Sequence, residues 1–374
     1  MPQTAVLIVT LTLMLLGLPL AGLYSAGIPP GPYLQFPPQT EFVRHAPFRW
    51  SVFAAYAAFI GAVVTPFLVR WFRSRRPGPS RAEPRLFPWW GWAGVGSAAV
   101  AWVLAWSRFP WFSALQPHTF TGLWLSYIVV VNALAHRSSG KCLLTHRTGL
   151  LAALFPVSAA FWWFFEFLNR FVQNWYYSGS RYGPWMYFAL ATLSFSTVLP
   201  AVASTWDWIR HRPRLDRAFG HFVPIAIARP RLLCWAVLAA AGAGLWGIGI
   251  WPDLLFPLLW VSPLLIVVSV QALFRQRHVF SDLARGDWRV VVSSAVAALV
   301  CGLFWEMWNY HSLARWQYSV PYVERFTIFE MPLLGFAGYL PFGLECMAVA
   351  DAVSRRFAKG SLFDGYAHDP SESH

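Results

Sequence analysis

Apolar blocks close to 20 residues long recur along almost the whole of this 374-residue chain. A helix of about 20 apolar residues is long enough to cross a hydrocarbon core of roughly 30 Å. Only 12% of the residues are charged, whereas about 25% is normal in a soluble protein. Because the blocks leave no room for a separate soluble domain, the sequence predicts an all-α, polytopic membrane protein.

Ten blocks are long enough to count as transmembrane helices. We expect the first to be retained, because it lacks the basic start of a signal peptide and is long for one, although the small residues at 21–26 leave cleavage open. A cluster of prolines after it predicts an irregular loop, since proline interrupts a helix. The ten predicted spans fall near residues 4–24, 48–69, 87–107, 118–136, 149–172, 185–209, 232–251, 254–274, 290–311 and 329–353.

The basic residues are distributed unevenly between the loops. If the amino terminus is cytoplasmic, 22 of the 29 lysines and arginines lie on the inner side and seven on the outer side. The positive-inside rule then places both termini in the cytoplasm. The net charge of +13 therefore follows the topology, and since no nucleic-acid-binding motif occurs, we expect no nucleic-acid partner.

A short motif recurs after about 140 residues. Glu166 and Asn169 precede a Trp and a Tyr in the first copy, and Glu306 and Asn309 do so in the second. Such a repeat predicts two copies of a four-helix unit, related by an axis along the membrane normal. The expected organisation is an N-terminal two-helix hairpin with an Arg-rich cytoplasmic loop (1–86), a first repeat (87–217), a second repeat (218–356) and a cytoplasmic tail (357–374).

The two motif glutamates lie near the outer ends of their predicted helices, roughly 25–29 Å from the inner ends at 1.5 Å per residue. Each asparagine follows its glutamate by three residues and so shares its helical face. One interpretation is a pair of acid/base or ligand-binding groups that line an outward-facing cavity between the repeats. The alternative is that Glu and Asn tie helix ends together, with partners such as Arg170 and Arg315.

Glu345 is predicted to lie near the middle of the bilayer, where an ionisable residue is costly and usually marks a function. The Gly- and Pro-rich stretch before it and Pro200 in the sister span both predict interrupted helices, which often frame a midplane site. The alternative is a protonated Glu345 that bonds to freed backbone carbonyls. Glu330 is expected to open the last span, where its charge would favour the helix N-terminus.

The stretches 161–175, 304–309, 329–336 and 341–346 resemble a family of Trp-rich polytopic bacterial membrane proteins. The resemblance covers the repeat region and implies a location in the bacterial cytoplasmic (inner) membrane. It implies no particular activity. Membrane-bound lycopene cyclases also bury carboxylates among aromatic helices, but their paired acidic motif is not present here.

Three functions from different classes are compatible with these features. The first is an enzyme that acts on a lipid or isoprenoid, with Glu345, Glu306 and Glu166 as catalytic acids and aromatic faces that stabilise a developing cation. In that case Glu345→Gln should abolish turnover. The second is a carrier or flippase with a site between the repeats, and the third is a non-catalytic scaffold subunit.

The enzyme hypothesis also predicts a binding wall of aromatic and polar side chains. Its expected partner is a membrane lipid or isoprenoid, and the sequence leaves a homo- or hetero-oligomer open. No metal or redox cofactor is expected, because the four cysteines are scattered and no His/Cys cluster has ligand spacing. The predicted substrate-binding residues are Asn169, Asn309, Trp162, Trp163, Trp305, Trp308 and Glu330.

Overall fold

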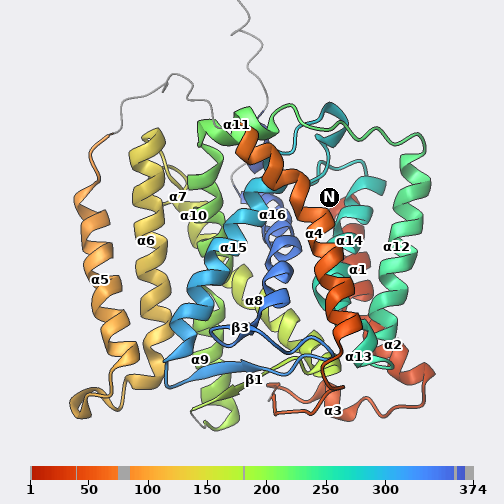
Figure 1. Cartoon of the computed structure of the whole chain (residues 1–374), viewed down its shortest axis with the longest axis horizontal. Helices are drawn as coiled ribbons and strands as arrows, with labels where there is room; N and C mark the ends of the chain where they lie inside the picture. Colours follow the sequence, from red (N-terminus) through yellow and green to blue (C-terminus); the bar gives the residue numbers. More distant parts are fainter. Residues whose placement is uncertain (1, 39, 75–84, 180–181, 358–359, 367–374) are drawn as a thin grey trace, which may run out of the picture.

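Long helices lie side by side and form most of the molecule in the computed structural model, which describes residues 2–38, 40–74, 85–179, 182–357 and 360–366 (Figure 1). Within this part of the chain, eight helical segments are long and apolar enough to cross a membrane. The predicted class, a helical integral membrane protein, is therefore confirmed. The eight segments are Val6–Ser25, Trp50–Arg73, Gln116–Ser139, Thr148–Val172, Pro184–Arg210, Pro230–Gly247, Arg289–Tyr310 and Leu333–Phe357.

The individual elements alternate between long helices and short connecting turns. The long helices are α4 (Trp50–Arg73), α5 (Trp89–Trp106), α6 (Thr119–Ser139), α8 (Thr148–Val172), α9 (Pro184–Phe195), α10 (Val198–Arg210), α12 (Pro230–Gly247), α14 (Leu258–Leu273), α15 (Arg289–Tyr310) and α16 (Tyr339–Phe357). The first segment consists of α1 (Pro2–Thr12), the π-helical turn η1 (Leu13–Gly17) and α2 (Leu18–Ser25). Shorter elements are α3 (Gly31–Leu34), α7 (Leu143–His146), α11 (Pro213–Phe219), α13 (Pro252–Leu255), the 3-10 turns η2 (Pro110–Phe112), η3 (Gln116–His118), η4 (Leu283–Arg285), η5 (Leu333–Gly338) and η6 (Leu362–Tyr366), and the strands β1 (Trp175–Ser178), β2 (Arg315–Tyr318), β3 (Thr327–Ile328) and β4 (Met331–Pro332).

Burial differs sharply between the helices. α10 packs against α6, α8, α15 and α16, and every residue from Val198 to Asp207 is buried. In contrast, α4 contains no buried residue. Because α4 is apolar along most of its length before Arg70, its exposed side chains are suited to contact lipid.

Close helix packing in the core depends on glycine at one position in particular. A Cβ at Gly343 of α16 would collide with the backbone oxygen of Ser294 in α15. Only glycine allows the two backbones to approach so closely. This contact fixes α16 against α15 just before Glu345.

Both predicted helix interruptions are present. In the first predicted repeat, α9 ends at Phe195 and α10 begins at Val198, shortly before Pro200. In the second, the 3-10 turn η5 precedes α16, which begins at Tyr339. Proline removes a backbone donor and glycine weakens a helix, which explains both breaks.

The prediction that Glu330 opens the helix of the last span is wrong, although the span itself begins at Leu333, close to the predicted residue 329. Glu330 lies instead in the two-residue turn between β3 and β4, after Phe329 in a left-handed conformation with φ 57°. The helix begins nine residues later, because Pro332, Gly335 and Gly338 favour turns over a continuous helix. Glu330 therefore does not interact with a helix N-terminus.

Strands β1 and β2 pair antiparallel at one end of the molecule, which we call the strand end (Figure 1). Trp175 lies opposite Tyr318, and Tyr177 lies opposite Trp316. Since alternate residues of a strand share a face, these four aromatic side chains lie on the same side of the pair.

The Pro-rich loop between α2 and α4 folds across the strand end, and α3 is the single helical turn among its described residues. Its Phe42 ring contacts Tyr176 of β1 at 5.6 Å between centroids. His45 approaches the Asp253 carboxylate at 2.6 Å, and the Ala46 backbone N–H donates to the other oxygen of Asp253 at 3.0 Å. The loop is thus tied to α13 and covers β1.

Candidate functional site

A cavity of about 1170 Å³ lies at the strand end, bounded by α4, α6, α9, α14, η5 and α16. Small-molecule pockets are typically about 300–1,000 Å³, so this cavity can hold a larger ligand. Its wall is rich in aromatic side chains. They include Trp162, Trp175, Tyr177, Tyr187, Trp260, Trp305, Trp316, Tyr318, Tyr339 and Phe342.

Glu166 of α8 lies directly behind this wall and is fully buried. Its Oε1 accepts hydrogen bonds from the Tyr177 hydroxyl at 2.6 Å, from Trp162 Nε1 at 3.0 Å and from Trp175 Nε1 at 3.0 Å. All three donors belong to residues that line the cavity. Three donors on one oxygen suit an ionised carboxylate, which only accepts hydrogen bonds.

Glu306 of α15 is held in the same way. Its Oε1 accepts from the Tyr318 hydroxyl and from the Tyr339 hydroxyl, each at 2.7 Å. Trp316 Nε1 donates to the Tyr318 oxygen at 2.9 Å, which extends the chain of hydrogen bonds. Both tyrosines line the cavity, so the second carboxyl also stands one side chain behind it.

The two carboxyls differ in the residue four positions before each glutamate. Trp162 precedes Glu166 by four residues, whereas the corresponding position before Glu306 is Gly302. A Cβ at Gly302 would come 2.5 Å from the Tyr339 ring, so the glycine leaves room for this tyrosine. Glu166 therefore accepts from Trp162 of its own helix α8, whereas Glu306 of α15 accepts from Tyr339 of the following helix α16.

Asn169 and Asn309 do not line the cavity. Asn169 Nδ2 donates to the Trp175 carbonyl at 2.8 Å and its Oδ1 accepts from the Asn174 N–H at 2.8 Å. Asn309 Nδ2 donates to the Trp316 carbonyl, and its Oδ1 accepts from the Trp316 N–H, both at 2.8 Å. Each asparagine thus fixes the connection between its helix and its strand, and so positions the tyrosine that follows.

Burial raises the pKa of the Tyr177 hydroxyl well above its usual value, and the nearby Glu166 carboxyl raises it further. The pKa of Tyr318 is raised well above its usual value for the same reasons, with Glu306 as the neighbour. Both phenols therefore keep their protons at neutral pH. They can donate to a carboxylate on one side while a lone pair faces a ligand on the other.

Phe342 of α16 joins the walls around the two carboxyls. It is almost completely buried, and its ring contacts Trp162 at 5.8 Å and Trp305 at 6.2 Å between centroids. Trp260 of α14 contacts the same ring at 5.8 Å. The aromatic surface is thus continuous from one Glu site to the other.

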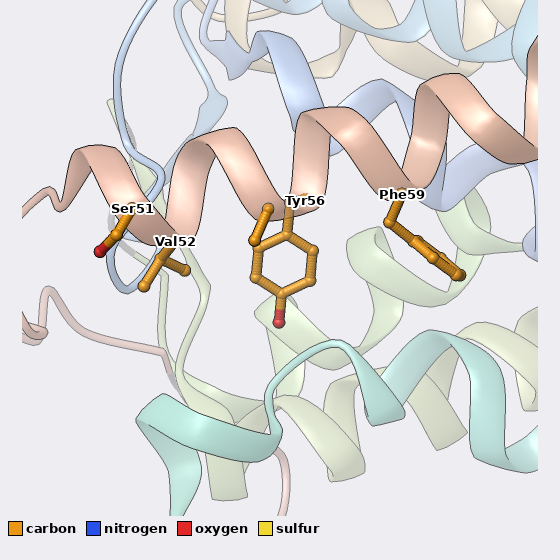
Figure 2. Close-up of a pocket in the computed structure, with 5 residues that line it drawn as sticks. Ser51, Val52, Tyr56 and Phe59 are labelled. Carbon is orange, nitrogen blue, oxygen red and sulfur yellow. The ribbon is translucent and has the colours of Figure 1, made fainter.

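The side of the cavity formed by α4 is loosely packed. Tyr56, Phe59, Ile60, Val63 and Val64 of this helix line the cavity, although α4 has no buried residue. A shallow hollow of about 400 Å³ lies along the same helix, and its lining side chains project from one side of α4 across open space (Figure 2). The Phe59 side chain is 67% exposed. The cavity therefore borders the apolar outside of the helical bundle.

Few charged residues line the cavity within the described part of the chain. Arg315 is one, and it lies 3.6 Å from the Glu330 carboxylate. Glu41 of the covering loop is another, and His118 lies at the end of α6. Charge is therefore confined to the rim, and the interior is aromatic and hydroxyl-bearing.

Glu345 lies in α16 three residues after Phe342 and is 2% exposed. Like Glu166 and Glu306, it is not among the residues that line the cavity. Among the described residues, its Oε2 has no hydrogen-bond partner, and the same is true of Oε2 in the other two glutamates. The structure thus places Glu166 and Glu306 one side chain behind the cavity and Glu345 in the helix packing beneath it.

The predicted aromatic wall divides in the same way. Trp162 and Trp305 line the cavity. Trp163 instead donates to Thr192 of α9 at 2.9 Å, and Trp308 is buried against Trp124 at 5.3 Å between centroids. These two tryptophans pack helices together outside the cavity wall.

Sequence reasoning missed Tyr339, Trp260 and Phe342 as parts of the site. Tyr339 belongs to the Gly- and Pro-rich stretch that predicted an interruption, but nothing in that stretch indicates that its hydroxyl reaches Glu306. Tyr177 and Tyr318 occur in the repeated motif, so their recurrence was a usable signal.

The described residues contain no group of His, Cys, Asp and Glu side chains arranged to hold a metal ion. The polar side chains that line the cavity include phenol, indole, carboxamide, carboxyl, alcohol, imidazole and guanidinium groups. No protein-family model, curated protein or solved structure matches this chain.

Proposed function

We propose that this chain is an integral membrane enzyme that binds a lipid or isoprenoid in the aromatic cavity and acts on it by general acid–base catalysis. One observation carries the proposal. Two buried carboxyls, Glu166 and Glu306, each accept a hydrogen bond from a tyrosine that lines the same cavity. A purely structural pair of carboxyls would not need to lie behind a shared cavity.

In the proposed reaction, Tyr177 or Tyr318 is the group that touches the substrate. The substrate transfers a proton to the phenol oxygen and keeps the electron pair of the broken bond. The tyrosine's own proton moves at the same time to Oε1 of its glutamate, over 2.6 Å or 2.7 Å. The reverse transfer protonates the product, so each pair serves as base and then as acid.

Access from the bilayer supports a lipid substrate. The α4 side chains on the cavity wall are apolar, and several of them also face the outside of the bundle. A hydrocarbon chain can lie along this helix without crossing water, while the polar part reaches the tyrosines. Such an arrangement favours a substrate with an apolar chain over a small water-soluble one.

The proposed topology has ten spans, with both termini in the cytoplasm of a bacterium and the strand end outside. It adds α5 and α14, whose 18 and 16 residues extend about 27 and 24 Å, to the eight segments given above. The uneven distribution of basic residues supports this orientation.

We also propose that residues 87–217 and 218–356 are duplicated units. Each carboxyl accepts from a tyrosine of its strand, each asparagine bonds to the backbone at the start of that strand, and the register of β1 and β2 fits a twofold axis between Tyr176 and Gln317. The proposed axis runs along the membrane normal. The cavity would then lie where the two units meet.

The proposal is tested by incubating the purified protein, in lipid nanodiscs, with a bacterial lipid extract and analysing the lipids by mass spectrometry. Wild type is compared with Tyr177→Phe/Tyr318→Phe, with Glu166→Gln/Glu306→Gln and with Glu345→Gln. We expect conversion of a lipid species by wild type and by Glu345→Gln, and a loss of more than 100-fold in both double variants, in line with acid–base contributions of about 10²–10⁴.

The earlier expectation that Glu345 is the catalytic acid stays a prediction, and the same experiment decides it. Loss of conversion in Glu345→Gln alone would contradict the role assigned to the tyrosine pairs. A lipid that co-purifies without being converted would support a carrier, and no bound lipid at all would support a scaffold.

A further inference from the structure

Several polar atoms in the cavity wall have no partner among the described residues. They are Asn174 Oδ1, the Tyr187 hydroxyl, the Tyr182 hydroxyl and Thr40 Oγ1. All four atoms are buried within the protein. A buried polar atom without a hydrogen bond costs free energy and is rare in folded proteins, so a cluster of them needs an explanation.

Asn174 gives the clearest case. This residue is only 4% exposed. Its backbone is fully used, because the N–H donates to Asn169 Oδ1 at 2.8 Å and the carbonyl accepts from the Ser319 N–H at 2.9 Å. The carboxamide oxygen is therefore held in place by the backbone but makes no hydrogen bond to the described residues.

Tyr187 extends the same polar region. Its ring lies 6.4 Å from that of Tyr177 and 6.2 Å from that of Trp163, both between centroids. Tyr177 is the residue that donates to Glu166. Tyr187 with its unpartnered hydroxyl thus lies beside Tyr177, and Asn174 directly precedes Trp175, which also donates to Glu166.

The charge around this region bears on the choice of headgroup. Glu166 and Arg170 act on Tyr187 with opposite charges, so their effects on a charged headgroup partly cancel. Arg170 of the same helix donates from Nη1 to the Pro32 carbonyl at 2.7 Å and does not line the cavity. The unpartnered groups are three hydroxyls and one amide oxygen, which together suit a ligand with hydroxyl groups that both donate and accept.

We propose that this end of the cavity is a headgroup subsite for a lipid whose polar part is uncharged and hydroxyl-bearing. A ligand hydroxyl donates to Asn174 Oδ1, and the Tyr187 hydroxyl donates to a ligand oxygen. This inference rests on the proposed function, because it assumes that the cavity binds a lipid. It adds the chemical class of the headgroup and the residues that select it.

The test measures the binding of two probes with identical acyl chains, dioleoylglycerol and dioleoyl phosphatidate, by native mass spectrometry of the purified full-length protein. Wild type is compared with Asn174→Leu, with Tyr187→Phe and with the exposed control Tyr24→Phe. We expect wild type and the control to prefer dioleoylglycerol. Each cavity variant should bind it about fivefold more weakly, the effect of one hydrogen bond near 1 kcal/mol.

Thermal unfolding of the same samples separates a binding effect from misfolding. Removal of an unpartnered buried atom should leave the melting temperature unchanged or raise it. Weaker dioleoylglycerol binding with an undiminished melting temperature would support the subsite. If the melting temperature of one variant falls, the other variant carries the comparison, because Asn174 and Tyr187 lie in different elements.

Three results would overturn the inference in distinguishable ways. Equal binding of dioleoylglycerol by wild type and both variants would contradict the subsite alone. A preference of wild type for the phosphatidate would contradict the uncharged headgroup and leave lipid binding intact. Binding of neither probe, together with no lipid conversion, would overturn the proposed function as well.

Discussion

Replacing Glu166 by glutamine keeps the size of the side chain and removes its negative charge. In the structure, Oε1 of Glu166 accepts three hydrogen bonds, from Tyr177, Trp162 and Trp175. If the carboxyl is ionised, these bonds are charge-assisted and the substitution weakens all of them. We therefore expect Glu166→Gln to lower the free energy of unfolding.

The size of the effect follows from the number of donors. A hydrogen bond to a charged group contributes about 1.5–3 kcal/mol, and one between neutral groups contributes about 0.5–1.5 kcal/mol. The loss is thus about 1 kcal/mol per donor, or about 3 kcal/mol for Glu166. Glu306 has two donors, Tyr318 and Tyr339, so Glu306→Gln should cost about 2 kcal/mol.

Unfolding with sodium dodecyl sulfate in mixed micelles would measure both values. Glu41→Gln is a suitable control, because Glu41 is exposed at the cavity rim, and it should change stability by less than about 0.5 kcal/mol. A cost below that level for Glu166→Gln would refute the ionised carboxylate. A larger cost for Glu306→Gln than for Glu166→Gln would refute the argument from donor number.

Three further substitutions test the packing and the covering loop. Gly343→Ala should lower the melting temperature, because a Cβ there collides with the Ser294 backbone and overpacking costs about 1–3 kcal/mol. An unchanged melting temperature would argue against the close approach. Asn309→Ala should speed hydrogen exchange of the β2 amides by removing both of its hydrogen bonds to that strand, and normal protection would contradict this role. Asp253→Asn should make the loop between α2 and α4 more sensitive to proteases, since His45 loses its charged partner; cleavage at the wild-type rate would show that the ion pair does not hold the loop.

The helical membrane class could be predicted because it depends on local composition. Runs such as Trp50–Arg73 exceed the length of a membrane crossing by themselves, and the structure has a helix there. The prediction for Glu330 was wrong for the opposite reason. The residues around it are apolar like those of α16, so they look like part of the same span. The prolines and glycines among them instead favour short strands and a 3-10 turn.

The carboxyls of the site were predicted from recurrence, whereas their surroundings were not. Glu166 and Glu306 stand out because one motif occurs twice. The pairing of β1 with β2 joins segments about 140 residues apart, and no local pattern encodes such a contact. Tyr339 reaches Glu306 only because Gly302 leaves space on a neighbouring helix, which is a property of the packed structure.

We propose that the two Glu–Tyr pairs share one lipid-binding cavity. Photocrosslinking tests this most directly, with a diacylglycerol that carries a diazirine near the headgroup end of one acyl chain. Peptide mass spectrometry then identifies the labelled residues. We predict that labels concentrate on the cavity residues Tyr177, Trp305 and Tyr318, and that excess dioleoylglycerol competes them away. Labels confined to exposed tryptophans such as Trp92 and Trp235, without competition, would contradict the claim.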